Sequence, residues 1–161
     1  MNMPESLQEQ AGEGIQKNNI LLETINRIAK ESKHNIEHLS TLQKQADSIH
    51  SITRTIQNIA THTNLLAFEA ARAGVAVREF DVVATEVRNF SNNVQQSISE
   101  VKTNVDLITE EINLITRSIG NVHQIIRTSQ GRVSETMDEF TIILESSEQL
   151  GRSANDFTEI L

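Results

Sequence analysis

Apolar and small residues recur along nearly the whole chain at alternating intervals of three and four residues. In the first half, one seven-residue register holds Leu39, Leu42, Ala46, Ile49, Thr53, Ile56, Ala60, Thr63, Ala67 and Ala70. In the second half, a matching register holds Val101, Val105, Ile108, Ile112, Ile115, Ile119, Val122, Ile126, Ser129 and Val133. The stripe then continues toward the end with Phe140, Ile143, Leu144, Leu150, Phe157 and Leu161. A period of 3.5 residues sustained this long predicts supercoiled α-helices.

An additional apolar neighbour often widens the stripe, as in the pairs Ile52/Thr53, Ile59/Ala60 and Leu66/Ala67. A widened stripe is more typical of a four-helix bundle than of a two-stranded coil. Gly74 lies near the middle of the chain and can end a helix in the left-handed conformation. A turn at this point predicts two helices of about 70–80 residues, each about 105–120 Å long.

The predicted fold is therefore all-α: a long antiparallel helical hairpin that dimerises into an antiparallel four-helix bundle. We expect one domain over residues 1–161, with a descending arm at about 5–73, a tip at about 74–79 and a returning arm at about 80–161. The alternative is one uninterrupted helix that assembles as a parallel coiled coil, because the stripe almost continues through the midpoint. The residues that would carry it are Ala67, Ala70, Gly74, Val77, Phe80 and Val83.

Composition supports long helices and excludes several other classes. The 161 residues include no Trp, Tyr or Cys, five Phe and a single Pro at position 4. So few aromatic residues cannot fill a large globular core, and the lack of cysteine excludes disulfides and thiolate metal sites. We find no phosphate-binding loop and no nucleophile–base set, so we predict neither an enzyme nor a bound cofactor or metal.

The net charge of −8 is distributed unevenly: residues 1–73 carry eight acids and seven bases, and residues 74–161 carry fourteen acids and seven bases. This acidity argues against contact with nucleic acid or an anionic membrane surface. No stretch approaches 18 consecutive apolar residues, and no signal-peptide pattern opens the chain. We expect a cytoplasmic location, either as a stand-alone protein or as an excised domain.

Four short motifs surround the midpoint: TNLLA at 63–67, EAARAG at 69–74, F-x-VVA at 80–84 and EVRNF at 86–90. Together they resemble the membrane-distal tip of bacterial methyl-accepting chemotaxis receptors. Each motif is weak alone, and the combination is specific. The resemblance covers about 35 residues, and the two arms share only the heptad character of that family.

The resemblance implies a signal-transduction module that presents its tip to a histidine kinase and its coupling protein. It also implies a homodimer, and assembly of the dimers into trimers. Glu69 and Arg72 match the charged residues between neighbouring dimers in such trimers. Further matching tip residues are Asn64, Leu65 and Leu66, of the trimer and kinase-facing surfaces, and Arg78, Phe80 and Val82, on the side that docks the coupling protein. Phe68, between the first two motifs, completes the predicted partner-binding set.

The tip departs from the family pattern at the same place. Where the family has roughly LNAAI between TNLLA and EAARAG, this chain has only Phe68, and Val77 and Glu79 replace family glycines. Four missing residues shorten one arm by about 6 Å and rotate the part of the arm beyond them by about 40°. A docking surface built from both arms would then be misaligned. A kinase-inactive adaptor and a purely structural dimerising coiled coil are the alternative functions.

Two residue pairs are candidates for receptor methylation, because paired Glu or Gln on an exposed helix face resembles the sites of that family. They are Glu110-Glu111 and Glu148-Gln149, and solvated helix carboxylates are the simpler interpretation of both. His34 and His38 share a helix face at a spacing that can bind a metal, but no third ligand accompanies them. A polar exposed face explains the two histidines better.

Overall fold

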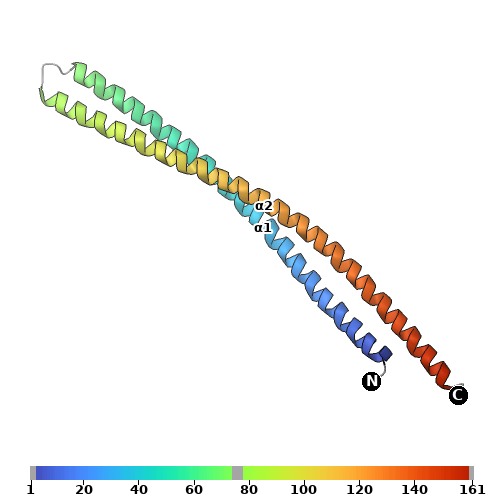
Figure 1. Ribbon diagram of the computed structural model, residues 1–161. Helices are drawn as coiled ribbons and strands as arrows, with labels where there is room; N and C mark the ends of the chain where they lie inside the picture. Colours follow the sequence, from blue (N-terminus) through green and yellow to red (C-terminus); the bar gives the residue numbers. More distant parts are fainter. Residues whose placement is uncertain (1–2, 74–77, 160–161) are drawn as a thin grey trace. The chain divides into compact units, whose positions relative to one another are not determined.

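The computed structural model describes residues 3–73 and 78–159, which form two helices. Helix α1 spans Met3–Ala73 and helix α2 spans Arg78–Glu159. The two helices run antiparallel and pack against each other along their length (Figure 1). This confirms the predicted all-α hairpin and excludes the uninterrupted helix. The turn predicted at Gly74 lies outside the described residues. No described helix contains a stretch apolar enough to cross a membrane.

Internal contacts divide the hairpin into two units, each built from both helices. Unit 1 combines residues 1–36 with residues 118–161, and unit 2 consists of residues 37–117. Unit 1 therefore contains both chain ends, and unit 2 contains the residues next to the midpoint. Each unit packs its two helices in the same way.

One row of residues in each helix, spaced seven residues apart, is buried against the other helix. In α1 the row consists of Ala11, Ile25, Ser32, Leu39, Ala46, Thr53, Ala60 and Ala67. In α2 it consists of Ala84, Ser91, Val105, Ile112, Ile119, Ile126, Val133 and Ser147. We call this row position a and letter the following positions b to g. In unit 1 four partly buried apolar residues pack around Ile25, Ile126 and Val133 of this row: Leu22, Ala29, Val122 and Met137.

The a rows of the two helices meet in a fixed register. In unit 1 the Ser147 hydroxyl donates to the Pro4 carbonyl at 2.6 Å. In unit 2 the Ser91 hydroxyl donates to the Ala60 carbonyl. In an antiparallel pair of helices, residues that face each other have numbers with a constant sum. Both of these pairs add up to 151, so the register is the same in the two units. The same rule pairs Ile25 with Ile126 and Leu39 with Ile112, so the buried side chains face each other in layers.

The polar and charged side-chain pairs between the helices lie on one flank of the a row. In unit 1 Gln130, at position e, donates to Asn26, at position b, at 2.9 Å. In unit 2 His50 at e lies 3.9 Å from Asp106 at b. Positions e and b lie on the same side of a helix, because each residue turns the chain by about 100°. On this side, which we call the polar face, hydrophilic pairs join the two helices, and in unit 1 its e positions also include the apolar residues Leu22, Ala29 and Met137.

The other flank of the a row, at positions d and g, carries most of the large apolar residues that stay exposed. At position d these are Leu7, Leu21, Ile28, Leu42, Ile49, Phe80, Val101, Ile108, Ile115, Ile143 and Leu150. At position g they are Met3, Ile52, Ile59, Leu66, Val83, Phe90 and Ile125. We call this side the apolar face. The heptad stripe seen in the sequence is therefore split: most of its a positions are buried in the hairpin, and most of the large apolar residues at its d and g positions remain open.

The shortened tip does not interrupt the buried row within the described residues. The row continues in steps of seven to Ala67 in α1 and begins again in register at Ala84 in α2. These two residues also add up to 151, as do the pairs farther from the tip. The two arms therefore match each other in register, although the family pattern has four more residues in one of them.

The aromatic ring of Phe140 occupies the space that the side chain of a larger residue at position 14 would need. The ring lies against Gly14, so closely that a Cβ atom at Gly14 would overlap the ring. Gly14 is buried, and Ala11, one turn earlier, is 1% exposed. The sequence pattern alone did not indicate this contact. Gly120, in contrast, has no atom within 4 Å of the place where a Cβ would stand.

Replacing Gly14 by alanine should destabilise the hairpin, because the overlap with Phe140 costs about 1–3 kcal/mol and exceeds the gain in helix propensity. Gly120→Ala is the matched control and should stabilise the protein by about 1 kcal/mol. Chemical unfolding followed by circular dichroism measures both changes. A second substitution, Phe140→Leu, should remove most of the cost of Gly14→Ala. Equal stability of the two alanine variants would contradict the proposed contact.

Candidate functional site

The residues predicted to bind partners gather at the end of unit 2 next to the midpoint. The predicted turn at about 74–79 is flanked by these residues, and from here on we use the name tip for residues 60–72 of α1 and 80–91 of α2. Asn64 is half-buried, and the other predicted residues of α1 are exposed: Leu65, Leu66, Phe68, Glu69 and Arg72. In α2, Phe80 and Val82 are exposed as well, and Arg78 is the first residue of the helix. The fold thus brings both halves of the predicted set to one end of the unit.

The outer positions of the hairpin, b and f, are hydrophilic or glycine along both described helices, except at the tip. The exceptions are Leu65 at f and Phe68 at b in α1, and Val82 at f in α2. Leu65 is 58% exposed and Val82 is 63% exposed. Exposed apolar side chains at outward positions are typical of a surface that contacts another protein. Position c also points outward and carries exposed apolar residues outside the tip, at Ile20, Leu107, Leu114 and Ile142. Within the described helices, positions b and f are apolar at the tip alone.

The structure distributes the predicted residues over two faces. Leu66 at g and Phe80 at d belong to the apolar face and continue the row that extends along the rest of the hairpin. Val83 and Phe90, both at g, add to this face and were absent from the predicted set. Leu65, Phe68 and Val82 point away from that row. Sequence motifs alone did not separate the two faces, because one motif, TNLLA, contributes to both.

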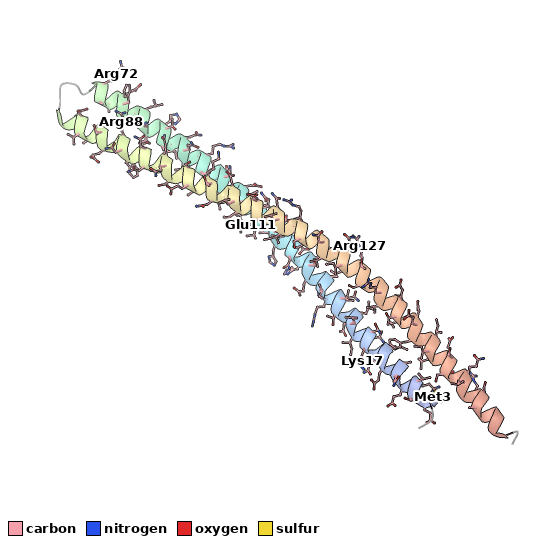
Figure 2. The ribbon with its side chains drawn as sticks, in the orientation of Figure 1. Met3, Lys17, Arg72, Arg88, Glu111 and Arg127 are labelled. Carbon is pink, nitrogen blue, oxygen red and sulfur yellow. The ribbon has the colours of Figure 1, made fainter. Side chains whose placement is uncertain are left out.

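Phe68 and Arg88 join the two helices at the tip. The Arg88 guanidinium carbon lies 5.9 Å from the centre of the Phe68 ring, which is within the range of a cation–π contact. Phe68 at b and Arg88 at e have the same relation as the hydrophilic pairs of the polar face, such as Asn26 and Gln130. Figure 2 shows Arg88 and Arg72 near the tip on opposite helices. Arg88 was not predicted as a site residue, although the EVRNF motif contains it.

Small side chains in the buried row hold the helices close together at the tip. Ser91 is 1% exposed and its hydroxyl donates to the Ala60 carbonyl of the other helix. Ala84 and Ala67 form the next layer toward the midpoint. On the polar face, Gln95 also donates to the Thr61 hydroxyl at 3.3 Å. These layers contain little apolar volume, and hydrogen bonds between the helices help to fix their register.

The remaining candidates are exposed. Glu110, Glu111, Glu148 and Gln149 are all open to solvent, and Glu148 lies 3.7 Å from Arg152. Exposure makes the four side chains accessible to a modifying enzyme, and it is equally the property of ordinary solvated residues. In the described part of the chain no group of three or more His, Cys, Asp or Glu side chains is arranged to hold a metal ion.

Comparison with known proteins places these features in a family. Residues 3–160 match the methyl-accepting chemotaxis protein (MCP) signalling domain. The chain is 34% identical to the methyl-accepting chemotaxis protein McpQ of Pseudomonas putida over 148 residues, which cover 89% of this chain and 20% of McpQ. It is 31% identical to McpG of the same species, with 95% and 25% coverage. It is 34% identical to McpA of Bacillus subtilis, with 80% and 20% coverage. The chain thus spans a quarter or less of the length of these relatives.

The contact between Phe68 and Arg88 should appear as an energetic coupling between the two residues. In a double-mutant cycle with Phe68→Leu and Arg88→Gln, we expect a coupling of about 0.5–1 kcal/mol, which is typical of exposed cation–π pairs. Unfolding in urea measures the four stabilities. Arg54→Gln in place of Arg88→Gln provides the control, because Arg54 is an exposed cation of α1 that lies about 21 Å along the helix from Phe68. A coupling as large with Arg54 as with Arg88 would show that the interaction is not specific.

Proposed function

Because the chain belongs to the family of methyl-accepting chemotaxis protein signalling domains, we propose that it is a cytoplasmic module that transmits a signal by presenting its tip to a histidine kinase and a coupling protein. Domains of this family are in general non-enzymatic receptor modules. The relatives are about four to five times as long as this chain. Their sensing activities and partners therefore do not extend to it without experiment.

The apolar face supports a homodimer. Each unit has exposed apolar residues at d and g, for example Leu7 and Leu150 in unit 1 and Ile59 and Val83 in unit 2. Leaving so many large apolar side chains in water is unfavourable, since each fully buried Leu or Ile contributes about 1.5–3 kcal/mol. A second hairpin presenting the same face would cover them about a two-fold axis. The product is the four-helix bundle expected from the width of the stripe.

The observation that carries the proposed function is that, within the described helices, apolar residues occupy positions b and f only at the tip. In a dimer formed through the apolar face, positions b and f stay outside. Leu65, Phe68 and Val82 would therefore remain available to a further protein. Glu69 and Arg72 are exposed beside them and supply charged groups at the edge of the patch. This arrangement, apolar in the centre and charged at the rim, is usual for protein interfaces.

We assign different roles to the two tip surfaces. Leu65, Phe68 and Val82, with Glu69 and Arg72, form the surface for neighbouring dimers in a trimer, or for the kinase and the coupling protein. Leu66 and Phe80 lie on the apolar face, so we assign them to the pairing of two hairpins at the tip. Asn64 and Arg78 complete the proposed partner-binding set.

Control of a kinase would operate through a change between two packings of the bundle. Methylation of Glu110, Glu111, Glu148 or Gln149 after deamidation would change the charge on the exposed surface and bias that equilibrium. The second candidate function is an adaptor that binds the coupling protein and does not activate the kinase. The missing helical turn next to Phe68 favours it, because a surface shared by both arms would be displaced by about 6 Å relative to the family pattern.

A charge on the apolar face should prevent dimerisation. Ile108→Asp places a carboxylate at an exposed d position, and burying it unpaired between two hairpins would be strongly unfavourable. We expect analytical ultracentrifugation to show the mass of one chain for this variant and of two chains for the wild type. Thr103→Asp, at an outward f position, is the control and should leave the dimer intact. A dimeric Ile108→Asp variant would contradict the proposed interface.

The outward tip patch should be needed for binding to the coupling protein but not for dimerisation. Leu65→Ser should weaken binding about five- to thirtyfold, which corresponds to the loss of about 1–2 kcal/mol at an interface. Leu107→Ser is a matched control, because Leu107 is 56% exposed and lies outside the tip. Isothermal calorimetry measures the affinity and ultracentrifugation the mass. Unchanged binding by Leu65→Ser would refute the tip assignment, and binding without kinase activation would identify the adaptor.

A further inference from the structure

Unit 1 carries two bands of opposite charge. The basic band comprises residues 24–36 and 118–134, whose only acidic residue is Glu31. Its basic residues are Arg27, Lys30, Lys33, Arg127 and Arg132. The acidic band comprises residues 3–23 and 135–154, in which Lys17 and Arg152 are the only basic residues. Its acidic residues are Glu5, Glu9, Glu13, Glu23, Glu135, Asp138, Glu139, Glu145 and Glu148.

The fold assembles each band from segments that are far apart in the sequence. Within the basic band, Gln130 donates to Asn26 at 2.9 Å and Ser32 lies 3.5 Å from His123. Within the acidic band, Ser147 donates to the Pro4 carbonyl. The cations of α1 and of α2 therefore share one level of the unit, and so do the acids. The charge bands are a property of the folded hairpin as much as of the sequence.

The two bands also differ in how their cations are engaged. In the acidic band, Lys17 lies 2.9 Å from Glu13 and Arg152 lies 3.7 Å from Glu148, each one helical turn away. Within the described residues no ion pair engages the cations of the basic band, and all five are exposed. Figure 2 labels one cation of each band, Arg127 and Lys17. The basic band is therefore an uncompensated positive surface on a chain of net charge −8.

The charges that could face a neighbour lie at outward positions. Lys30 at f and Lys33 at b are three residues apart on α1, and Arg127 at b lies on α2. In the acidic band, Glu145 at f and Glu148 at b have the same three-residue spacing on α2. A pair of cations and a pair of anions with equal spacing, about 4.5 Å along the helix axis, can face each other across two helices. Neither pair belongs to the apolar face.

We propose that the basic band of one molecule binds the acidic band of a second copy, in a lateral and staggered contact separate from the apolar face. Lys30 and Lys33 of one copy face Glu145 and Glu148 of the other. The second copy is the favoured occupant because the same chain carries the complementary charges at the same spacing and at outward positions. A contact between two charged helix surfaces needs no pocket, which suits cations that are all exposed.

The contact has a characteristic dependence on ionic strength. Exposed ion pairs are individually weak, so the association is weak and requires several pairs together. At low salt, the net charge of −8 on each copy adds a long-range repulsion. Near physiological ionic strength the Debye length is about 8 Å, which screens distant charges more than facing ones. Association is therefore strongest at intermediate salt and declines at high salt, whereas an apolar contact would be strengthened by salt.

The test exchanges the charges of the two bands. The variant K30E/K33E inverts the basic side and E145K/E148K inverts the acidic side. We call the species present at low protein concentration, either the proposed dimer or a single hairpin, the basal species. Sedimentation equilibrium at high protein concentration, in about 0.02 to 0.5 M sodium chloride, measures association beyond this species. Each variant alone should lose at least about fivefold in association constant, and an equimolar mixture of both should recover the wild-type value. K44E/K102E, with the same change in net charge but outside unit 1, is the control and should associate at least half as strongly as the wild type.

Several outcomes would overturn the proposal. It fails if the wild type does not associate beyond the basal species at any ionic strength. It fails as well if the association constant of the control falls as much as that of K30E/K33E, or if the mixture of the two inverted variants does not recover the wild-type association constant. It also fails if polyglutamate binds the wild type but not K30E/K33E while the protein does not self-associate, because the band would then serve another acidic partner. The experiment measures further association of the basal species, whether that species is the proposed dimer or a single hairpin. A negative result would therefore overturn the lateral contact and would say nothing against the dimer.

Discussion

The whole arrangement depends on one packing constraint: each helix buries a single row of residues, one per heptad, against the same row of the other helix. Two helices in contact can enclose only the sector of each that faces the partner, and position a occupies this sector from Ala11 to Ala67 and from Ala84 to Ser147. The polar face closes beside the row with pairs such as Asn26 and Gln130. Because the hairpin buries mainly this sector of each helix, most of the apolar d and g residues on the other flank stay exposed and can contact another molecule.

The apolar face differs in heptad position from the two other proposed surfaces, and these two, which both use b and f, lie at different places along the helices. The apolar face uses d and g, the tip patch uses the outward positions of Leu65, Phe68 and Val82, and the charged residues of unit 1 at Lys30, Lys33, Glu145 and Glu148 use outward positions farther from the tip. A coiled-coil protein can in this way combine dimerisation, partner binding and lateral contact on two helices. The separation of the apolar face follows from the turn of about 100° per residue, which sends each position in its own direction.

The tip shows how a departure from a family pattern can be accommodated. The chain lacks four residues of one arm, and yet the rows on both sides of the midpoint keep a common register, shown by Ser91 with Ala60 and by Ser147 with Pro4. Small layers such as Ala67 and Ala84 permit the close approach that these hydrogen bonds require. Phe68, which stands in place of the missing turn, lies against Arg88 of the other helix. The shortened arm thus has contacts of its own.

The heptad pattern by itself determined that the chain forms two long helices packed as a hairpin, because a sustained 3.5-residue period admits few other structures. The motifs around Glu69 and Val82 located the candidate site at the tip. The tertiary structure alone decided which positions of the stripe are buried, since both a and d are largely apolar in the sequence and only the facing of the helices distinguishes them. It also decided the contacts of Phe140 with Gly14 and of Phe68 with Arg88. These join residues far apart in the chain, and their closeness depends on the register between the two helices, which no local pattern encodes.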